Sequence, residues 1–192
     1  MYTARMDTAE RLITSTQELL WERGYVGTSP KAIQERAGAG QGSMYHHFRG
    51  KADLAVTAMD RSAAELRAQA DAVLTEGATP VARIGAYLTR EREPLRGCRV
   101  GRMAMDPDVI DSDELRRPVE ETFVWLRERL AGIVADGVAA GELAPELDPS
   151  DTAAAIAAVV QGGYVLARAA GSREPFDRAV RGALALLTAA RP

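Results

Sequence analysis

Apolar residues recur every three or four positions along most of the chain, which is the spacing of a helix with one buried face. The region 114–140 keeps this spacing longest, and its apolar stripe consists of Leu115, Val119, Phe123, Leu126, Leu130 and Val134. No segment alternates apolar and polar residues in the way that predicts a β-strand. The pattern therefore predicts an all-α fold.

Glycine, proline and capping residues divide the chain into about nine helical segments. We expect helices near residues 9–23, 30–37, 41–48, 52–74, 81–92, 114–140, 149–170 and from 175 onward, with a short helix in an irregular stretch between 95 and 112. Thr8 is expected to cap the first helix. Pro118 is expected to mark either the true first turn of the long helix or a kink in it.

The composition agrees with a helical, globular protein. The chain has 192 residues, of which 46% are hydrophobic, and it contains 35 alanines and 22 arginines, both strong helix formers. One cysteine, Cys98, excludes an intramolecular disulfide. The N-terminus is polar, and the longest unbroken apolar run, 153–160, is far shorter than the roughly 18–20 residues of a membrane span. We expect a soluble, cytoplasmic protein without a membrane partner.

Charge is distributed unevenly. The formal net charge is −3, which by itself argues against nucleic-acid binding. Residues 23–51, however, carry five basic residues against Glu35 alone, a local charge of +4, and contain both lysines of the protein. The rest of the chain then sums to −7, because −7 + 4 = −3. A basic segment near the N-terminus of an acidic protein suggests a surface for phosphates.

The pattern of residues 28–48 predicts a short helix, a glycine-containing turn and a second short helix. This arrangement places its second helix in a DNA major groove. Met44 and Phe48 are four apart and are expected to face inward together. Gln41 can bond bidentately to adenine, and Ser43 can reach a base or a phosphate. The predicted DNA-binding residues are Thr28, Ser29, Lys31, Gln41, Gly42, Ser43, Tyr45, His46, His47 and Lys51.

The run GYVGTSPKAIQERAGAGQGSMYHHFRGKADL resembles the DNA-binding signature of the TetR family of bacterial transcriptional regulators. The positions that match the family pattern are Tyr45, His47, Phe48, Lys51 and Leu54. The resemblance covers residues 8–60. One departure is Gly40-Gln41-Gly42, which replaces the usual valine–serine and lysine or arginine run, so the family's base contacts do not carry over.

The resemblance implies a ligand-responsive regulator, most often a repressor, which a small molecule releases from a palindromic operator. It implies a helix-turn-helix DNA-binding domain over 1–52 and a ligand-binding and dimerisation domain over 53–192, with the homodimer formed by the last two helices. The small residues Ala154, Ala158 and Gly162 would permit close approach of such helices, although a buried helix in a monomer core explains them equally. The stretch 97–105 is similar to the subgroup that includes lincomycin-resistance and flavonoid-responsive repressors.

Aromatic and methionine side chains in the C-terminal part could line the effector pocket, with core packing as the alternative for each. These predicted pocket residues are Tyr87, Met103, Met105, Phe123, Trp125 and Tyr164. The effector itself stays unidentified at this stage.

Other functions find little support in the residues. Gly38-x-Gly40-x-Gly42 follows a helix, whereas a nucleotide-binding glycine loop follows a strand. His46 and His47 lack a third ligand, so no metal and no cofactor are expected. No nucleophile has a partner base, which argues against an enzyme. The remaining alternatives are a DNA-binding protein without a ligand, a small helical enzyme, and a redox role for Cys98.

Overall fold

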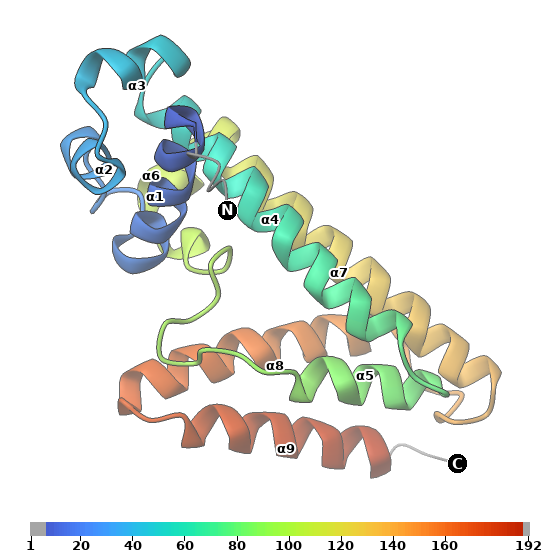
Figure 1. Ribbon diagram of the computed structural model, residues 1–192. Helices are drawn as coiled ribbons and strands as arrows, with labels where there is room; N and C mark the ends of the chain where they lie inside the picture. Colours follow the sequence, from blue (N-terminus) through green and yellow to red (C-terminus); the bar gives the residue numbers. More distant parts are fainter. Residues whose placement is uncertain (1–6, 190–192) are drawn as a thin grey trace, which may run out of the picture. The chain divides into compact units, whose positions relative to one another are not determined.

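The computed structural model describes residues 7–189, and every regular element within that range is a helix (Figure 1). The elements are α1 (Thr8–Arg23), α2 (Pro30–Ala37), α3 (Gln41–His47), α4 (Lys51–Thr75), α5 (Pro80–Thr89), the 3₁₀ turn η1 (Met103–Met105), α6 (Pro107–Ile110), α7 (Asp113–Ala139), α8 (Pro149–Ala170) and α9 (Glu174–Ala189). The predicted all-α fold of about nine helices is confirmed for the described part of the chain.

Two compact units divide the chain, and each combines two separate stretches of sequence. We call residues 7–64 with 99–120 the head, and residues 65–98 with 121–189 the body. The division falls within α4 and α7, so both helices contribute residues to both units. It differs from the domain boundary expected between residues 52 and 53, because the start of α4 and the segment 99–120 also pack in the head.

The head is organised around three short helices and the beginning of α4. Leu12 of α1, Ile33 of α2, Met44 of α3 and Leu54 of α4 are all completely buried. A helix of seven residues such as α3 is too short to be stable alone, so its conformation depends on this packing. Burial of Met44 thus fixes which face of α3 points outward.

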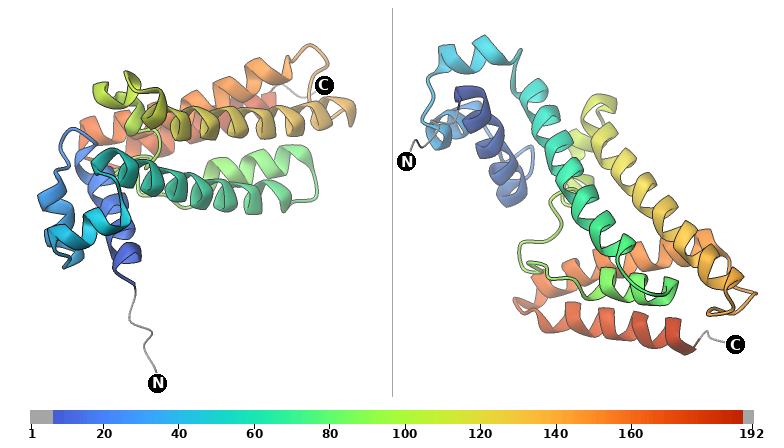
Figure 2. Two further views of the ribbon diagram at one scale, coloured as in Figure 1. Left: turned by 90° about the horizontal axis from the view of Figure 1, so that it is seen from above. Right: turned by 45° about the vertical axis from the view of Figure 1, so that its right-hand side comes forward.

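The body contains α5, α8, α9 and the later parts of α4 and α7. Helices α8 and α9 lie side by side and antiparallel (Figure 2). Their close approach requires Gly163, since an added Cβ there would lie 2.9 Å from the Phe176 ring. Across the two long helices, Arg129 Nε lies 2.8 Å from the Asp71 carboxylate.

Helix ends differ from the sequence prediction at several points. Asp7, rather than Thr8, is the N-cap of α1 and accepts a hydrogen bond from the Thr8 amide. Helix α7 begins at Asp113, so Pro118 lies inside the helix and not in its first turn. Because proline has no N–H, the carbonyl four residues earlier loses its helical partner. Helix α5 ends at Thr89, before the expected Arg92.

Helix α8 is apolar enough to be compared with a membrane span. By length and composition alone it could cross a membrane, and 33% of its apolar window is buried in the structure. This window does not form one unbroken apolar run, so the sequence pattern did not predict it as a membrane span. A single helix of this kind is weak evidence for a membrane span, because core helices of other proteins have the same length and composition.

Candidate functional site

The turn between α2 and α3 orients the candidate recognition helix. Gly38 ends α2 with a φ of +58°, a left-handed conformation that glycine adopts without strain. The Ala39 amide then donates to the Gln34 carbonyl at 3.0 Å, and Gly40 occupies the N-cap of α3 in an extended conformation. The glycines noted in the sequence therefore serve a tight helix-to-helix turn.

Helix α3 exposes almost every polar residue it carries. Met44 is buried and Phe48, the C-cap, is half-buried, as their spacing predicted. The exposed residues of the helix are Gln41, Gly42, Ser43, Tyr45, His46 and His47. The two histidine rings meet edge to face with centroids 5.0 Å apart. No group of three metal-ligating side chains occurs among the residues that the structure describes.

The predicted contacts at the start of α2 divide into buried and exposed residues. Thr28 is only 1% exposed, and its hydroxyl donates to the Gly24 carbonyl at 2.6 Å. Ser29 is exposed and caps α2 by accepting from the Ala32 amide at 3.1 Å. Lys31 points outward, with its ammonium 3.9 Å from Glu35 one turn later. The hydroxyl of Thr28 thus serves the fold of the head.

Lys51 begins α4 and lies against an aromatic ring. Its ammonium nitrogen is 3.8 Å from the centroid of Tyr25. Burial lowers the pKa of Lys51, while the carboxylates of Asp108 and Asp106 act in the opposite direction. Burial raises the pKa of Tyr25, and the same two carboxylates raise it further. Tyr25 therefore keeps its proton, and its ring positions the ammonium beside the first turn of α4.

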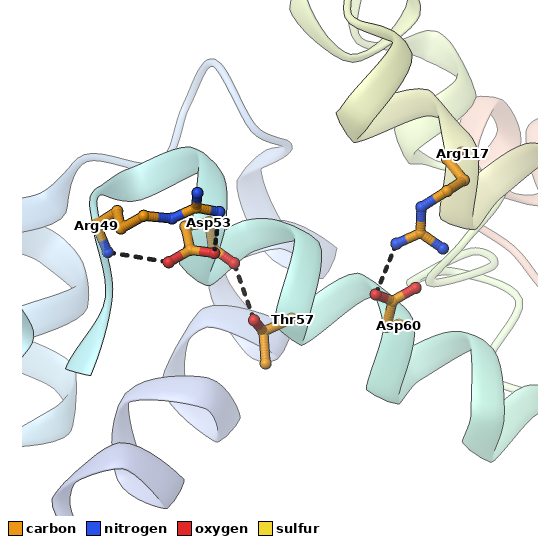
Figure 3. A network of polar contacts seen from close by, with 5 residues as sticks. All are labelled: Arg49, Asp53, Thr57, Asp60 and Arg117. Atoms are coloured by element: carbon orange, nitrogen blue, oxygen red, sulfur yellow. Dashed lines mark hydrogen bonds and ion pairs between the residues drawn. The ribbon is translucent and has the colours of Figure 1, made fainter.

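Two charged residues next to Lys51 hold the start of α4 (Figure 3). The Asp53 carboxylate accepts from the Arg49 amide at 2.9 Å and from the Arg49 guanidinium at 3.2 Å. These hydrogen bonds lower the pKa of Asp53. Further along α4, Asp60 pairs with Arg117 of α7 at 2.8 Å within the head. The loop after α3 is thereby fixed to α4.

These features define a helix-turn-helix DNA-binding head, with a short second helix held by its buried methionine and an outer face that can reach a groove. A family model described as "Bacterial regulatory proteins, tetR family" matches residues 12–58. A second, described as "Tetracyclin repressor-like, C-terminal domain", matches residues 80–183. The chain therefore belongs to the TetR family of bacterial transcriptional regulators, as its sequence motif indicated.

Individual relatives agree with this assignment. The transcriptional repressor DhaR of Mycobacterium sp. strain GP1 is 24% identical over 178 residues, which cover 91% of this chain and 89% of DhaR. A TetR transcriptional regulator from Chloroflexus aurantiacus is 30% identical, with a TM-score of 0.84 and 94% of each chain covered. Bacillus subtilis FadR, solved in complex with stearoyl-CoA, shares the fold at 18% identity, with a TM-score of 0.73 over 95% of this chain and 98% of FadR.

The residues predicted to line an effector pocket are divided between the two units. Tyr87 and Tyr164 are buried in the body, where Phe123 and Trp125 of α7 are half-buried. Met103 and Met105 belong to the head, and within η1 the first is 1% exposed and the second 77% exposed. Four of the six residues thus belong to the body.

A small hollow does occur in the head, beside Met103. Gln17 and Ser62 form part of its polar side and bond to each other at 3.1 Å. Its lining residues are Gln17, Leu20, Met59, Ser62, Arg99, Val100, Met103, Pro118 and Val119. The enclosed space is about the size of one water molecule, which is too small for an organic effector.

Sequence reasoning missed the charged group nearest to the two buried tyrosines. Arg92 is 8% exposed, and its guanidinium carbon lies 5.1 Å from the Tyr87 ring centroid. In the sequence it stands at the end of the expected helix 81–92, in the charged run Arg90-Glu91-Arg92-Glu93, which is typical of a solvated surface. No local pattern marks it, because its surroundings come from the end of α5 and from α9.

Proposed function

We propose that this regulator is a homodimeric repressor that releases its operator when a small molecule binds the body. The observation that carries the DNA-binding part is the outward polar face of α3, fixed by the buried Met44. Helix-turn-helix dimers place two such helices in successive major grooves, about 34–36 Å apart, on a palindromic site. The protein then works in the cytoplasm, where it meets DNA.

Each exposed residue of α3 has a proposed role. Gln41 reads a base, for which adenine offers the matching donor and acceptor, and Ser43 contacts a base or a phosphate. Tyr45, which is 50% exposed, and the two histidines hold phosphates. Gly42 faces open space, because an added Cβ there would meet no atom of the head within 4 Å. Its lack of a side chain leaves that space to the DNA backbone.

Residues outside α3 extend the phosphate surface. Ser29 and Lys31 lie at the first turn of α2, where the positive end of the helix also favours a phosphate. Lys51 contributes its ammonium group from the start of α4. For Thr28 we propose a backbone contact at most, since its hydroxyl is bonded inside the head. All of these contacts are independent of base sequence.

The dimer interface is proposed on α8 and α9. Helix α8 exposes an apolar stripe made of Ala154, Ala158, Gly162, Val165, Leu166 and Ala169. On α9, Leu186 is 76% exposed. A second copy covering this face would bury the apolar residues that gave α8 its resemblance to a membrane span, and the small residues would let the helices approach closely.

Effector binding is assigned to the body, with Tyr87, Phe123, Trp125 and Tyr164 as candidate contacts. The FadR structure supports this assignment only by analogy, as that protein carries stearoyl-CoA on a similar fold. Release follows if the effector binds more tightly to a state in which the two α3 helices no longer match the grooves. Since α4 and α7 continue from head to body, movement in the body can reach the recognition helix.

A test of this function uses fluorescence anisotropy with purified protein and labelled DNA from upstream of its own gene. The proposal predicts tight, salt-sensitive binding of two protomers per palindrome, which an effector weakens. A DNA-binding protein without a ligand would bind the same DNA, but no small molecule would release it. The proposal would be refuted if the protein bound the upstream DNA, and every fragment selected from the whole genome, as weakly as it binds random DNA.

A further inference from the structure

Arg92 is a buried cation at the end of α5. Its Nη1 donates to the carbonyls of Leu88 at 3.0 Å and Arg90 at 2.9 Å, and its Nη2 donates to the carbonyl of Tyr87. The Nε atom is buried and has no hydrogen-bond partner among the described residues. The guanidinium therefore caps the C-terminus of α5 through its two terminal nitrogens and leaves its Nε donor unsatisfied.

No carboxylate compensates this charge. Within the described part of the chain, Arg92 takes part in no ion pair, and the charged side chain that acts on it most strongly is Arg90, a second cation. Burial lowers the pKa of Arg92, and Arg90 lowers it further. Buried charges in proteins are normally paired, and the carbonyls at a helix C-terminus supply only a partial negative charge. The surroundings of Arg92 thus lack an anion.

The neighbouring polar side chains are also hydrogen-bond donors. Burial raises the pKa of Tyr164 to about 12 and also raises that of Tyr87, although Arg92 acts against both shifts. Both phenols therefore keep their protons at neutral pH and can donate. The Phe176 ring lies 5.9 Å from the Arg92 guanidinium and 5.0 Å from the Tyr164 ring. The guanidinium and the two phenols thus form a positively charged cluster of hydrogen-bond donors beside aromatic rings.

We propose that Arg92, Tyr87 and Tyr164 bind the carboxylate of the effector, and that the effector is an organic monocarboxylic acid with an apolar remainder. This inference rests on the proposed function, whose effector it specifies. The unsatisfied Nε–H can donate to one carboxylate oxygen, and the phenol hydroxyls of Tyr87 and Tyr164 can donate to the carboxylate as well. One negative charge balances the one buried cation, while the aromatic rings contact the apolar remainder.

The test is isothermal titration calorimetry of the full-length protein with a panel of acids. The probes are acetate, butyrate, octanoate, benzoate and phenylacetate, each compared with its primary amide, which has nearly the same shape but no charge. At least one acid is expected to bind, and its amide to bind at least about tenfold more weakly. If no acid of the panel binds, or if the amides bind equally well, the proposal is wrong.

Variants assign the binding to these residues. Arg92→Met keeps much of the side-chain volume and is expected to lower the affinity of the protein for the acid about 10- to 100-fold. Tyr164→Phe removes only the hydroxyl and is expected to lower the affinity for the acid severalfold. This second variant keeps the proposal testable if Arg92→Met does not fold. The matched control is Arg83→Met, within α5, whose guanidinium bonds to the Gly77 carbonyl. Unchanged affinity in both Arg92→Met and Tyr164→Phe would overturn the proposal.

Operator binding distinguishes this inference from the proposed function. Operator affinity of the wild type and of Arg92→Met is measured with and without the acid, and the ratio of the two values is compared; the acid should lower the affinity of the wild type and leave that of Arg92→Met unchanged. If the wild-type protein binds an acid through Arg92 but recognises no operator, the proposed function fails and the acid site stands. If it recognises an operator and no acid binds, only the acid site fails.

Discussion

The Asp106 carboxylate accepts a hydrogen bond from the backbone amide of Val26 at 3.0 Å, although 80 positions separate the two residues. Asp106 is 8% exposed and precedes α6, while Val26 lies in the turn between α1 and α2. This hydrogen bond ties the segment before α7 to the turn that leads into the DNA-binding helices. Both ends lie within the head.

Removing that carboxylate should destabilise the head. Asp106→Ala leaves the Val26 amide without its partner, and the expected loss is about 1–3 kcal/mol in the free energy of unfolding. Urea denaturation of both proteins measures the difference. Asp108→Ala is the control, since Asp108 is exposed two residues later and should change stability by less than about 0.5 kcal/mol. Equal effects of the two substitutions would contradict this role for Asp106.

Gly24 should resist substitution for two reasons. Its φ of +77° is strained for any residue with a Cβ, and an added Cβ would lie 2.9 Å from Asp106 Oδ2. We expect Gly24→Ala to lower the free energy of unfolding by about 1–3 kcal/mol. Gly40→Ala, at a position with an ordinary φ and open space, should cost little. Thermal unfolding of the two variants would show whether this difference exists.

The sequence predicted the parts of the head that depend on local rules. The glycines at 38 and 40 and the four-residue spacing of Met44 and Phe48 specify the turn and the inward face of α3 without reference to the rest of the chain. The position of the Thr28 hydroxyl could not be predicted in this way, because two arrangements compete for it. It either faces a ligand at the start of α2 or bonds to the carbonyl four residues before it, and packing selects the second role.

The body was harder to predict because its polar residues are placed by tertiary contacts. Arg92 was expected inside a helix, but α5 ends at Thr89 and its last carbonyls accept from the arginine. In the head, too, local pattern did not decide burial: Met103 and Met105 looked equivalent in sequence, yet the tight turn η1 buries the first and exposes the second. Such differences depend on which surfaces meet, which spacing along the chain does not specify.

The Asp53 carboxylate should stabilise the start of α4 in a pH-dependent way. Its folded pKa lies below the ordinary value of 3.8 because Arg49 donates to it. Its contribution is therefore complete above about pH 3.8 and disappears as the pH falls through the lower, folded pKa. Asp53→Asn should lower the free energy of unfolding at pH 7 by only about 0.5–1 kcal/mol, because solvent screens the exposed contact with Arg49. Urea unfolding of the wild type and Asp53→Asn from pH 7 to pH 3 should show that their difference in the free energy of unfolding decreases only below about pH 3.8.

The dimer interface on α8 and α9 should be sensitive to one charge. Leu166→Glu places a carboxylate on the exposed apolar stripe, where Leu166 is 53% exposed in the single chain. The variant should fold, sediment as a monomer and bind operator at least about 100-fold more weakly, because two half-sites are no longer engaged together. Leu95→Glu, with Leu95 52% exposed elsewhere in the body, should stay dimeric. A dimeric Leu166→Glu protein would show that the interface lies elsewhere.

Lys51 and Gln41 should affect DNA binding in different ways. Lys51→Ala removes a phosphate contact, so it should weaken binding to all sequences and reduce the slope of log affinity against log salt by about one. Gln41→Ala should change base preference at one position in each half-site and leave the salt slope nearly unchanged. Arg178→Ala on α9, an exposed arginine paired with Glu174, is the control for loss of positive charge. Anisotropy titrations at several salt concentrations separate these effects.

The central claim, that this head reads a palindromic operator as a dimer, is tested most directly by sequencing the DNA fragments that the purified protein selects from a genomic library. We expect enrichment of one palindromic motif whose half-sites are centred about one helical turn, or a small multiple of it, apart. Repeating the selection with Gln41→Ala should change one base in each half-site of that motif. Selected fragments without a shared motif, or a motif that Gln41→Ala leaves unaltered, would contradict the account of α3 as the recognition helix.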